Sequence, residues 1–229
     1  MKLSVIVPVY NEKSTITEIL TKLSDLDLAG VEKEIIIVDD CSVDGTREFL
    51  KSSNGWGRVL FHDQNQGKGA AIRSGLKEAT GDYVVIQDAD LEYDPSDFKP
   101  MMEKMISEGL LVLYGSRRLK EENTQYSGLL YYFGGWLLTI LANLLYGQKL
   151  TDEPTCYKMF KTDFLKNLDL HCRRFEFCPE VTALTALRGI KISEVPISYR
   201  PRHKAEGKKI CWRDELVAIW TLLKYRIKI

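Results

Sequence analysis

Two aspartates separated by one residue follow an apolar run in the first half of the chain. The run is Tyr83–Gln87 and the pair is Asp88 and Asp90. Side chains alternate faces in an extended chain, so both carboxylates point the same way, and Glu92 continues that face as a third ligand or a bystander. Mg²⁺ and Mn²⁺ prefer carboxylate oxygens, and Mg²⁺ is commonly shared with substrate phosphates. The pair therefore indicates a metal clamp for a diphosphate, with solvated turn residues as the alternative.

Apolar runs alternate with helix-like segments around this pair. Strands are expected at Leu3–Val9, Glu34–Val38, Val59–Phe61 and Tyr83–Gln87, and helices at Ser14 to about Leu26, from near Asp44, and at Gly69–Glu78. The alternation predicts an α/β fold with a parallel, doubly wound sheet, in which ligands lie beyond the carboxyl ends of the strands. Tyr10–Glu12, Asp39–Asp40 and the aspartate pair all follow strands, so one site drawn from three strand ends is expected.

Composition places the chain among ordinary globular proteins. It has 229 residues, 45% hydrophobic and 28% charged, which predicts one domain and excludes a disordered or fibrous class. Five cysteines without a CxxC pair indicate reduced thiols in a cytoplasmic compartment rather than a zinc site. Pro8, Asn11 and Glu12 end the first apolar run too early for a signal peptide.

Charge is distributed unevenly although the formal net charge is zero. Residues 200–229 hold nine Lys or Arg against three acidic residues, a net charge of +6, and the remainder of the chain carries −6. The basic tail is expected to meet an anionic partner such as substrate phosphates or a lipid surface, with a solvated basic helix as the alternative. No nucleic-acid partner is expected.

A Gly-Lys-Gly sequence at 67–69 resembles a P-loop but is not one. His62 and Gly69 stand where that motif requires Gly and Ser or Thr. Flexible backbone on both sides would let Lys68 approach a ligand, aided by the positive end of the following helix, or the segment is a plain helix-start loop. No GxGxxG follows the first strand, so no dinucleotide cofactor is expected.

Four motifs together resemble those of family 2 inverting glycosyltransferases. They are Val7–Glu12, Val38–Thr46, Asn65–Ala71 and Asp88–Asp90. Within that family the chain is most similar to the polyprenyl-phosphate (dolichyl-phosphate) mannose and glucose synthases, over roughly its whole length. The resemblance implies a glycosyltransferase A-type fold, with a Rossmann-like, mostly parallel central sheet flanked by helices. It also implies a nucleotide-sugar donor and Mg²⁺ or Mn²⁺.

The resemblance also assigns roles to individual residues. The base and ribose would lie against Pro8, Tyr10, Glu12 and Asp40, with Asp39 beside them. The metal and diphosphate would be held by Asp88 and Asp90, with Lys68, Gln87 and Ala89 as further donor contacts. The loop that closes over the diphosphate would contribute Arg202 and Lys208, which are not distinguished from their basic neighbours.

The acceptor decides what further groups are needed. A hydroxyl must lose its proton to a general base as it attacks, whereas a phosphate monoester is already an oxyanion near neutral pH and needs only cations. Arg117 follows the apolar strand Leu110–Tyr114 and matches the family's Gly-Ser-Arg step, so it is the candidate for an acceptor phosphate. Asp152 matches an acidic position near the acceptor, where it is the base for a hydroxyl acceptor or simply a turn residue.

An uncharged stretch at 127–148 has nearly the length that spans a bilayer. A span would place Arg202 and Asp88 on opposite sides, and Gly134–Gly135 interrupts the stretch. One or two amphipathic helices lying on the membrane are therefore expected, with a buried helix or a dimer contact as the alternative. Lys224, Arg226 and Lys228 would help to bind anionic headgroups. Because the chain stops at Ile229, anchoring is expected to be peripheral or supplied by a membrane-protein partner.

These features predict inverting transfer of a hexose from a UDP- or GDP-sugar to a polyprenyl phosphate at the cytoplasmic face of a membrane. Residues Thr155–Lys158 slightly favour UDP. A family 2 enzyme acting on a glycan hydroxyl, with Asp152 as base, is the alternative enzyme. A nucleotide-sugar binding protein without catalysis is disfavoured because the clamp and the cationic residues are all present.

Overall fold

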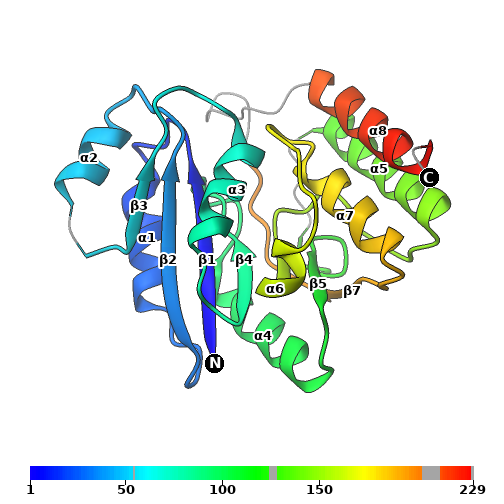
Figure 1. Cartoon of the computed structure of the whole chain (residues 1–229), viewed down its shortest axis with the longest axis horizontal. Helices are drawn as coiled ribbons and strands as arrows, with labels where there is room; N and C mark the ends of the chain where they lie inside the picture. Colours follow the sequence, from blue (N-terminus) through cyan, green and yellow to red (C-terminus); the bar gives the residue numbers. More distant parts are fainter. Residues whose placement is uncertain (54, 124–127, 203–211, 228–229) are drawn as a thin grey trace.

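A seven-stranded sheet with the order β3-β2-β1-β4-β6-β5-β7 forms the centre of the molecule (Figure 1). The computed structural model describes residues 1–53, 55–123, 128–202 and 212–227. The strands are β1 (Lys2–Val9), β2 (Glu32–Asp39), β3 (Arg58–Phe61), β4 (Tyr83–Ile86), β5 (Val112–Ser116), β6 (Lys158–Lys161) and β7 (Ser193–Pro196). The strands predicted before residue 90 and at 110–114 are confirmed, with ends shifted by one or two residues.

The predicted mostly parallel sheet is confirmed, and one strand in it is antiparallel. β6 runs antiparallel to both of its neighbours, β4 and β5, while the other pairs are parallel. β6 enters the sheet from the 152–157 loop and pairs Met159 with Val85 and Leu113. The sheet is therefore mixed and mostly parallel, and β6 places the 152–157 loop beside the end of β5.

The helices pack against the sheet and against one another. They are α1 (Ile16–Asp25), α2 (Thr46–Ser52), α3 (Lys68–Glu78), the 3₁₀ turn η1 (Pro95–Asp97), α4 (Phe98–Ser107), α5 (Leu129–Tyr146), α6 (Thr162–Lys166), α7 (Phe177–Leu187) and α8 (Trp212–Ile227). Helices α5, α7 and α8 lie together at one end of the molecule (Figure 1). A small cluster that includes Leu138, Ala142, Ala218 and Leu222 joins α5 to α8.

The expected interruption of the uncharged stretch at Gly134–Gly135 is wrong. Helix α5 continues through both glycines. Each glycine leaves room for a neighbouring side chain. A Cβ at Gly134 would collide with the carboxylate of Glu215 in α8, and one at Gly135 would lie 3.2 Å from the Pro154 ring. The glycines therefore serve close packing. Within the ranges that the structure describes, no helix is both long and apolar enough to cross a bilayer.

Candidate active site

A cavity of about 460 Å³ lies beyond the carboxyl ends of β1, β2 and β4 and extends to α5, α7 and α8. Its wall includes most of the predicted site residues. These are Pro8, Tyr10, Glu12, Asp40, Lys68, Asp88, Ala89, Asp90, Glu92, Arg117 and Arg202. The fold thus brings residues from both halves of the sequence into one site.

Asp40 fixes the loop that follows β3. Its carboxylate accepts hydrogen bonds from the backbone N–H groups of Gln66 at 2.8 Å and Gly67 at 2.7 Å, and lies 2.7 Å from Nδ1 of His62. The side chain is almost fully buried, yet the residue lines the cavity. Asp40 therefore supports the wall predicted to face the nucleoside, and it also holds Lys68 near the neighbouring strand end.

The glycines beside Lys68 let the start of α3 approach the backbone of residues 173–174 closely. The N–H groups of Gly69 and Ala70, at the start of α3, donate to the carbonyl oxygens of Arg174 at 3.0 Å and Arg173 at 2.9 Å. A Cβ at Gly67, where φ is +95°, would collide with the Arg173 carbonyl oxygen. The helix N-terminus is therefore capped by the 173–174 backbone, and the expectation that it faces a ligand is wrong for these two groups.

The two aspartates of the pair each contact a cationic side chain. Nζ of Lys68 lies 2.6 Å from Oδ1 of Asp88, and Nη2 of Arg202 lies 3.0 Å from Oδ2 of Asp90. Arg202 also pairs with Glu12 at 3.1 Å. Burial, and then the charges of Asp88 and Glu92, raise the pKa of Asp90 to about 7, although Arg202 opposes the shift. The site thus concentrates negative charge that favours bound cations.

The strand-face argument for this group is wrong, because β4 ends at Ile86 and a turn follows. Leu91 has a φ of +62°, so the backbone between Asp90 and Glu92 is left-handed and not extended. The Glu92 carboxylate accepts hydrogen bonds from the Arg202 backbone N–H at 2.7 Å and from the Tyr199 hydroxyl at 3.2 Å. Glu92 therefore ties the 199–202 segment to the clamp, and its metal ligation stays a prediction.

The donor atoms of the pair suit a hard divalent cation. Asp88 and Asp90 supply carboxylate oxygens on the cavity wall, whereas no group of three His, Cys, Asp or Glu side chains in the described part of the chain is arranged to hold a metal. Two carboxylates with the remaining positions left to phosphate and water is the usual arrangement for Mg²⁺ at phosphate substrates. The residues present fit a metal that is completed by its ligand.

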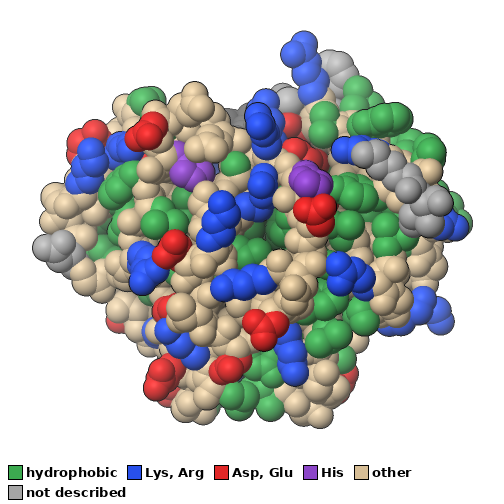
Figure 2. Space-filling model, viewed as in Figure 1, with side chains coloured by type: hydrophobic (Ala, Val, Ile, Leu, Met, Phe, Trp, Pro, Cys, Tyr) green, Lys and Arg blue, Asp and Glu red, His purple; other side chains and the backbone are tan. Residues whose placement is uncertain are grey.

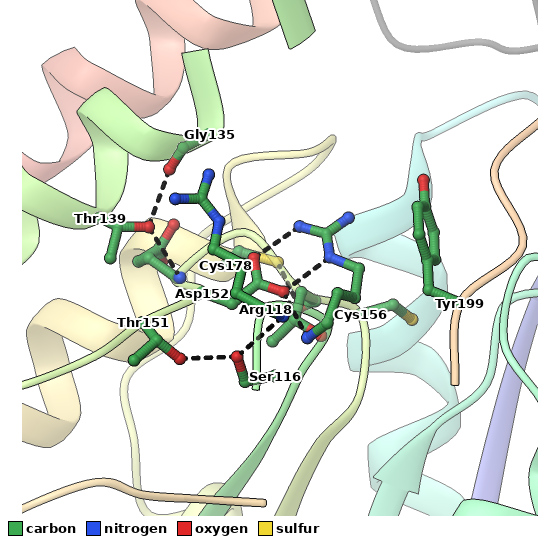
Figure 3. Close-up of polar contacts among 12 residues, drawn as sticks. Ser116, Arg118, Gly135, Thr139, Thr151, Asp152, Cys156, Cys178 and Tyr199 are labelled. Atoms are coloured by element: carbon green, nitrogen blue, oxygen red, sulfur yellow. Dashed lines mark hydrogen bonds and ion pairs between the residues drawn. The ribbon is translucent and has the colours of Figure 1, made fainter. Parts of the chain in front are cut away.

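Arg117, on the cavity wall, forms a bidentate ion pair with Asp152 behind it. The Arg117 backbone N, Nε and Nη2 donate to Asp152 at 2.9, 2.7 and 2.7 Å. Nearby, the hydroxyls of Ser116 and Thr151 are 2.6 Å apart (Figure 3). Burial would raise the pKa of Asp152, but the charge and hydrogen bonds of Arg117 hold it below its usual value. Asp152 is fully buried, and its hydrogen bonds hold the Arg117 side chain on the cavity wall.

Three predicted site residues lie behind the wall rather than on it, among the residues that the structure describes. They are Asp39, Gln87 and Asp152, each with no exposed surface. Asp39 accepts from the Ser42 backbone, and Gln87 accepts from the Tyr157 hydroxyl at 2.6 Å and donates to the Asp88 carbonyl at 2.9 Å. They support the loops that carry the wall. Lys208 lies outside the described residues.

A second group of wall residues was missed in the sequence. It includes Glu153, Arg174, Phe177, Cys178 and Glu215. These residues follow no parallel strand, so the rule that ligands lie beyond strand ends did not select them. The run of basic and aromatic residues at 173–177, just before a helix, was the available signal.

The family model described as glycosyl transferase family 2 matches residues 4–169. The chain belongs to that family. This glycosyltransferase is 30% identical over 213 residues to the dolichol-phosphate mannosyltransferase of Pyrococcus furiosus, covering 91% of this chain and 59% of that protein. It is 29% identical over 227 residues to the UDP-N-acetylglucosamine–dolichyl-phosphate N-acetylglucosaminyltransferase of Methanococcus voltae, covering 90% of this chain and 89% of that protein.

The glycosyltransferase A-type fold is confirmed by solved structures. Glucosyl-3-phosphoglycerate synthase from Mycobacterium tuberculosis, in complex with Mn²⁺, UDP and phosphoglyceric acid, superposes with a TM-score of 0.72 at 20% identity. The alignment covers 99% of this glycosyltransferase and 78% of that chain.

Proposed function

We propose that this glycosyltransferase moves a hexose, with inversion, from a UDP- or GDP-sugar to a polyprenyl phosphate at the cytoplasmic face of a membrane. The observation that carries the proposal is the extent of the cavity. Its wall includes Pro8 and Asp40 at the ends of β1 and β2, Asp88 and Asp90 after β4, Arg117 after β5, and Leu138 of α5 with Ala218 of α8. The strands among these lie in the order β2-β1-β4-β6-β5 across the sheet. A donor, an anionic group and an apolar chain would occupy these parts in that order.

The donor half would hold Mg²⁺ or Mn²⁺ through Asp88 and Asp90. When bound, the metal would stabilise the negative charge that grows on the leaving diphosphate. Lys68 and Arg202 lie against the same carboxylates, so they are placed to contact the diphosphate oxygens as well. The Mn²⁺ and UDP in the solved neighbour support this assignment.

The acceptor half favours a phosphate over a hydroxyl. Arg117 lines the cavity and is held by Asp152 on one side, while its guanidinium carbon lies 5.0 Å from the centre of the Tyr199 ring. A fixed guanidinium suits a phosphate oxyanion, which attacks without losing a proton. Asp152 is a poor base for the alternative hydroxyl acceptor. Its side chain is buried and accepts hydrogen bonds from Arg117, and the pKa of its carboxyl group is below the usual value. The dolichyl-phosphate relatives support the same choice.

The apolar surface beside the end of the cavity supports contact with a membrane. Helices α5 and α8 expose large apolar side chains, including Trp136 at 47% and Trp220 at 61%. Hydrophobic side chains are exposed over these helices at the upper right of the face in Figure 2. Lys224 and Arg226 occupy the last turn of α8. Tryptophan and basic residues together suit the boundary between headgroups and acyl chains.

The transfer reaction tests the proposal. Purified protein with Mn²⁺ and a short polyprenyl phosphate receives labelled UDP-glucose, UDP-N-acetylglucosamine or GDP-mannose, and the label in an organic phase is measured. We expect one donor to deliver label, Asp90→Ala to abolish transfer, and Asp169→Asn, at an exposed carboxylate, to retain it. Absence of label in the organic phase while the nucleotide still binds would refute the lipid acceptor.

Vesicle flotation tests the membrane contact separately. We expect the parent protein to float with vesicles that contain anionic lipid, and Trp136→Ser with Trp220→Ser to float much less. The matched control is Trp56→Ser, because Trp56 lies outside α5 and α8, just before β3, and packs partly against the main core. Equal flotation of the parent and the double variant would refute contact through α5 and α8.

A further inference from the structure

Tyr199 follows β7 and packs against Arg117, the arginine proposed to bind the acceptor phosphate. The centre of its ring lies 5.0 Å from the guanidinium carbon of Arg117, within the range of a cation–π contact, and both residues line the cavity. Asp152 accepts hydrogen bonds from Nε and Nη2 of the same guanidinium. Among the described residues, no group accepts a hydrogen bond from Nη1. A carboxylate and an aromatic ring therefore hold the guanidinium, and Nη1 is left for a ligand.

The backbones of Tyr199 and Arg117 are also tied together. Oδ1 of Asn123 accepts a hydrogen bond from the Tyr199 N–H at 3.1 Å. Nδ2 of the same side chain donates to the carbonyl oxygens of Arg117 at 2.7 Å and Ile197 at 2.8 Å. One amide thus bridges the chain after β5 and the chain after β7. The contact between ring and guanidinium is therefore set by the fold at the backbone of both residues.

The Tyr199 ring is fixed by its own neighbours. Its centre lies 5.4 Å from the centre of the Tyr93 ring, which lies 4.8 Å from that of the buried Tyr157 ring. The Tyr199 hydroxyl donates to Oε2 of Glu92 at 3.2 Å, and the Glu92 N–H donates to Asp90 at 3.1 Å. A column of tyrosine rings therefore connects the core to the acceptor arginine, and Glu92 connects that column to the metal clamp.

A fixed guanidinium is what phosphate binding requires. Two parallel N–H···O bonds form only when the guanidinium plane is correctly placed, and an ordered side chain loses less entropy on binding. Asp152 holds two of the three nitrogen atoms of Arg117, which leaves a tilt about the line that joins them. Nη1 would move most in such a tilt. A ring packed against the guanidinium opposes it.

We propose that Tyr199 is a positioning residue for acceptor binding, which holds the Arg117 guanidinium so that Nη1 meets the acceptor phosphate. The inference rests on the proposed polyprenyl phosphate acceptor. Because Tyr199 acts through Arg117, its loss should reduce the preference for a phosphate over an alcohol and leave the affinity for the apolar chain unchanged.

Acceptor binding in the absence of donor and metal tests this role. Calorimetry compares a short polyprenyl phosphate with the polyprenol of the same length, and we expect the parent protein to bind the phosphate more tightly. In Tyr199→Leu this preference should fall by about three- to thirtyfold, the range of a cation–π contact, with the affinity for the polyprenol unchanged. Tyr199→Phe retains the ring and should keep most of the preference. Tyr199→Met serves if the leucine variant fails to fold.

Two controls separate positioning from a general structural effect. In an Arg117→Gln background, Tyr199→Leu should cause no further loss of preference, because the tyrosine acts through that arginine. Tyr225 is a matched tyrosine, since its hydroxyl also donates to a glutamate, Glu180, at 2.6 Å, but it lies outside the cavity wall formed by the described residues. Tyr225→Leu should leave the preference intact.

The outcomes distinguish this inference from the acceptor assignment. If Tyr199→Leu retains the preference, weakens binding of the phosphate and the polyprenol equally, or adds its full loss to that of Arg117→Gln, the positioning role is overturned while the acceptor assignment stands. If the parent binds the polyprenyl phosphate no more tightly than the polyprenol, the acceptor assignment fails and the positioning role fails with it.

Discussion

Replacing Asp152 by Asn separates its two possible roles, as the partner of Arg117 or as a general base. The substitution removes the charge that faces a guanidinium and turns one acceptor oxygen into an amide donor. Breaking a buried ion pair costs about 3–5 kcal/mol. Asp152 is fully buried but the Arg117 side chain is 23% exposed, so the lower limit of about 3 kcal/mol applies. At about 2–4 °C per kcal/mol for a chain of this size, the Tm should fall by about 6–12 °C.

Calorimetry and initial rates measure the two effects together. If Asp152 positions Arg117, the KM for polyprenyl phosphate should rise in Asp152→Asn and the pH dependence of kcat should keep its shape. Asp169→Asn, at a carboxylate that is 85% exposed, should change neither Tm nor KM. A Tm within about 2 °C of the parent, with kcat lowered by about 10²–10⁴ and an altered pH profile, would identify a base and refute the pairing role.

Three further predictions concern the clamp, the Gly67 loop and the sheet edge. Asp90→Asn should lower the transfer rate by about a hundredfold, because a metal contributes several kcal/mol to transition-state stabilisation; an Mn²⁺ titration of activity measures this, and an unchanged rate contradicts it. Gly67→Ala should lower Tm more than Gly30→Ala, since both have positive φ but only Gly67 meets a backbone carbonyl; equal losses would exclude the collision. Although partial burial opposes this shift, hydrogen bonds from Lys2, Ser4 and Thr80 hold the pKa of Glu34 at about 2. The stability that Glu34 contributes is therefore complete above about pH 4.5 and is lost as the pH falls towards 2. The difference in free energy of unfolding between the parent and Glu34→Gln, measured in urea, should shrink over the same range.

Local sequence was sufficient for the parallel part of the fold. The run Leu3–Val9 is apolar except at Ser4, and Glu34–Val38 is apolar after its first residue, as is typical of strands buried on both faces; both are strands. The rule that sites lie beyond strand ends then located Tyr10, Asp40 and Asp88 on one cavity. The antiparallel β6 was not predicted, because Lys158–Lys161 is too short to show a period.

Contacts between distant segments were beyond any local pattern. Arg202 meets Asp90 across 112 residues, and Arg117 meets Asp152 across 35. Residue spacing alone therefore could not decide whether Asp152 is a general base, whereas the tertiary structure places it against Arg117. By itself the sequence determined the residue types, the approximate positions of the parallel strands and the family. Only tertiary packing decided which carboxylate faces the cavity and which is buried against a cation, because that choice depends on the segments packed around each side chain.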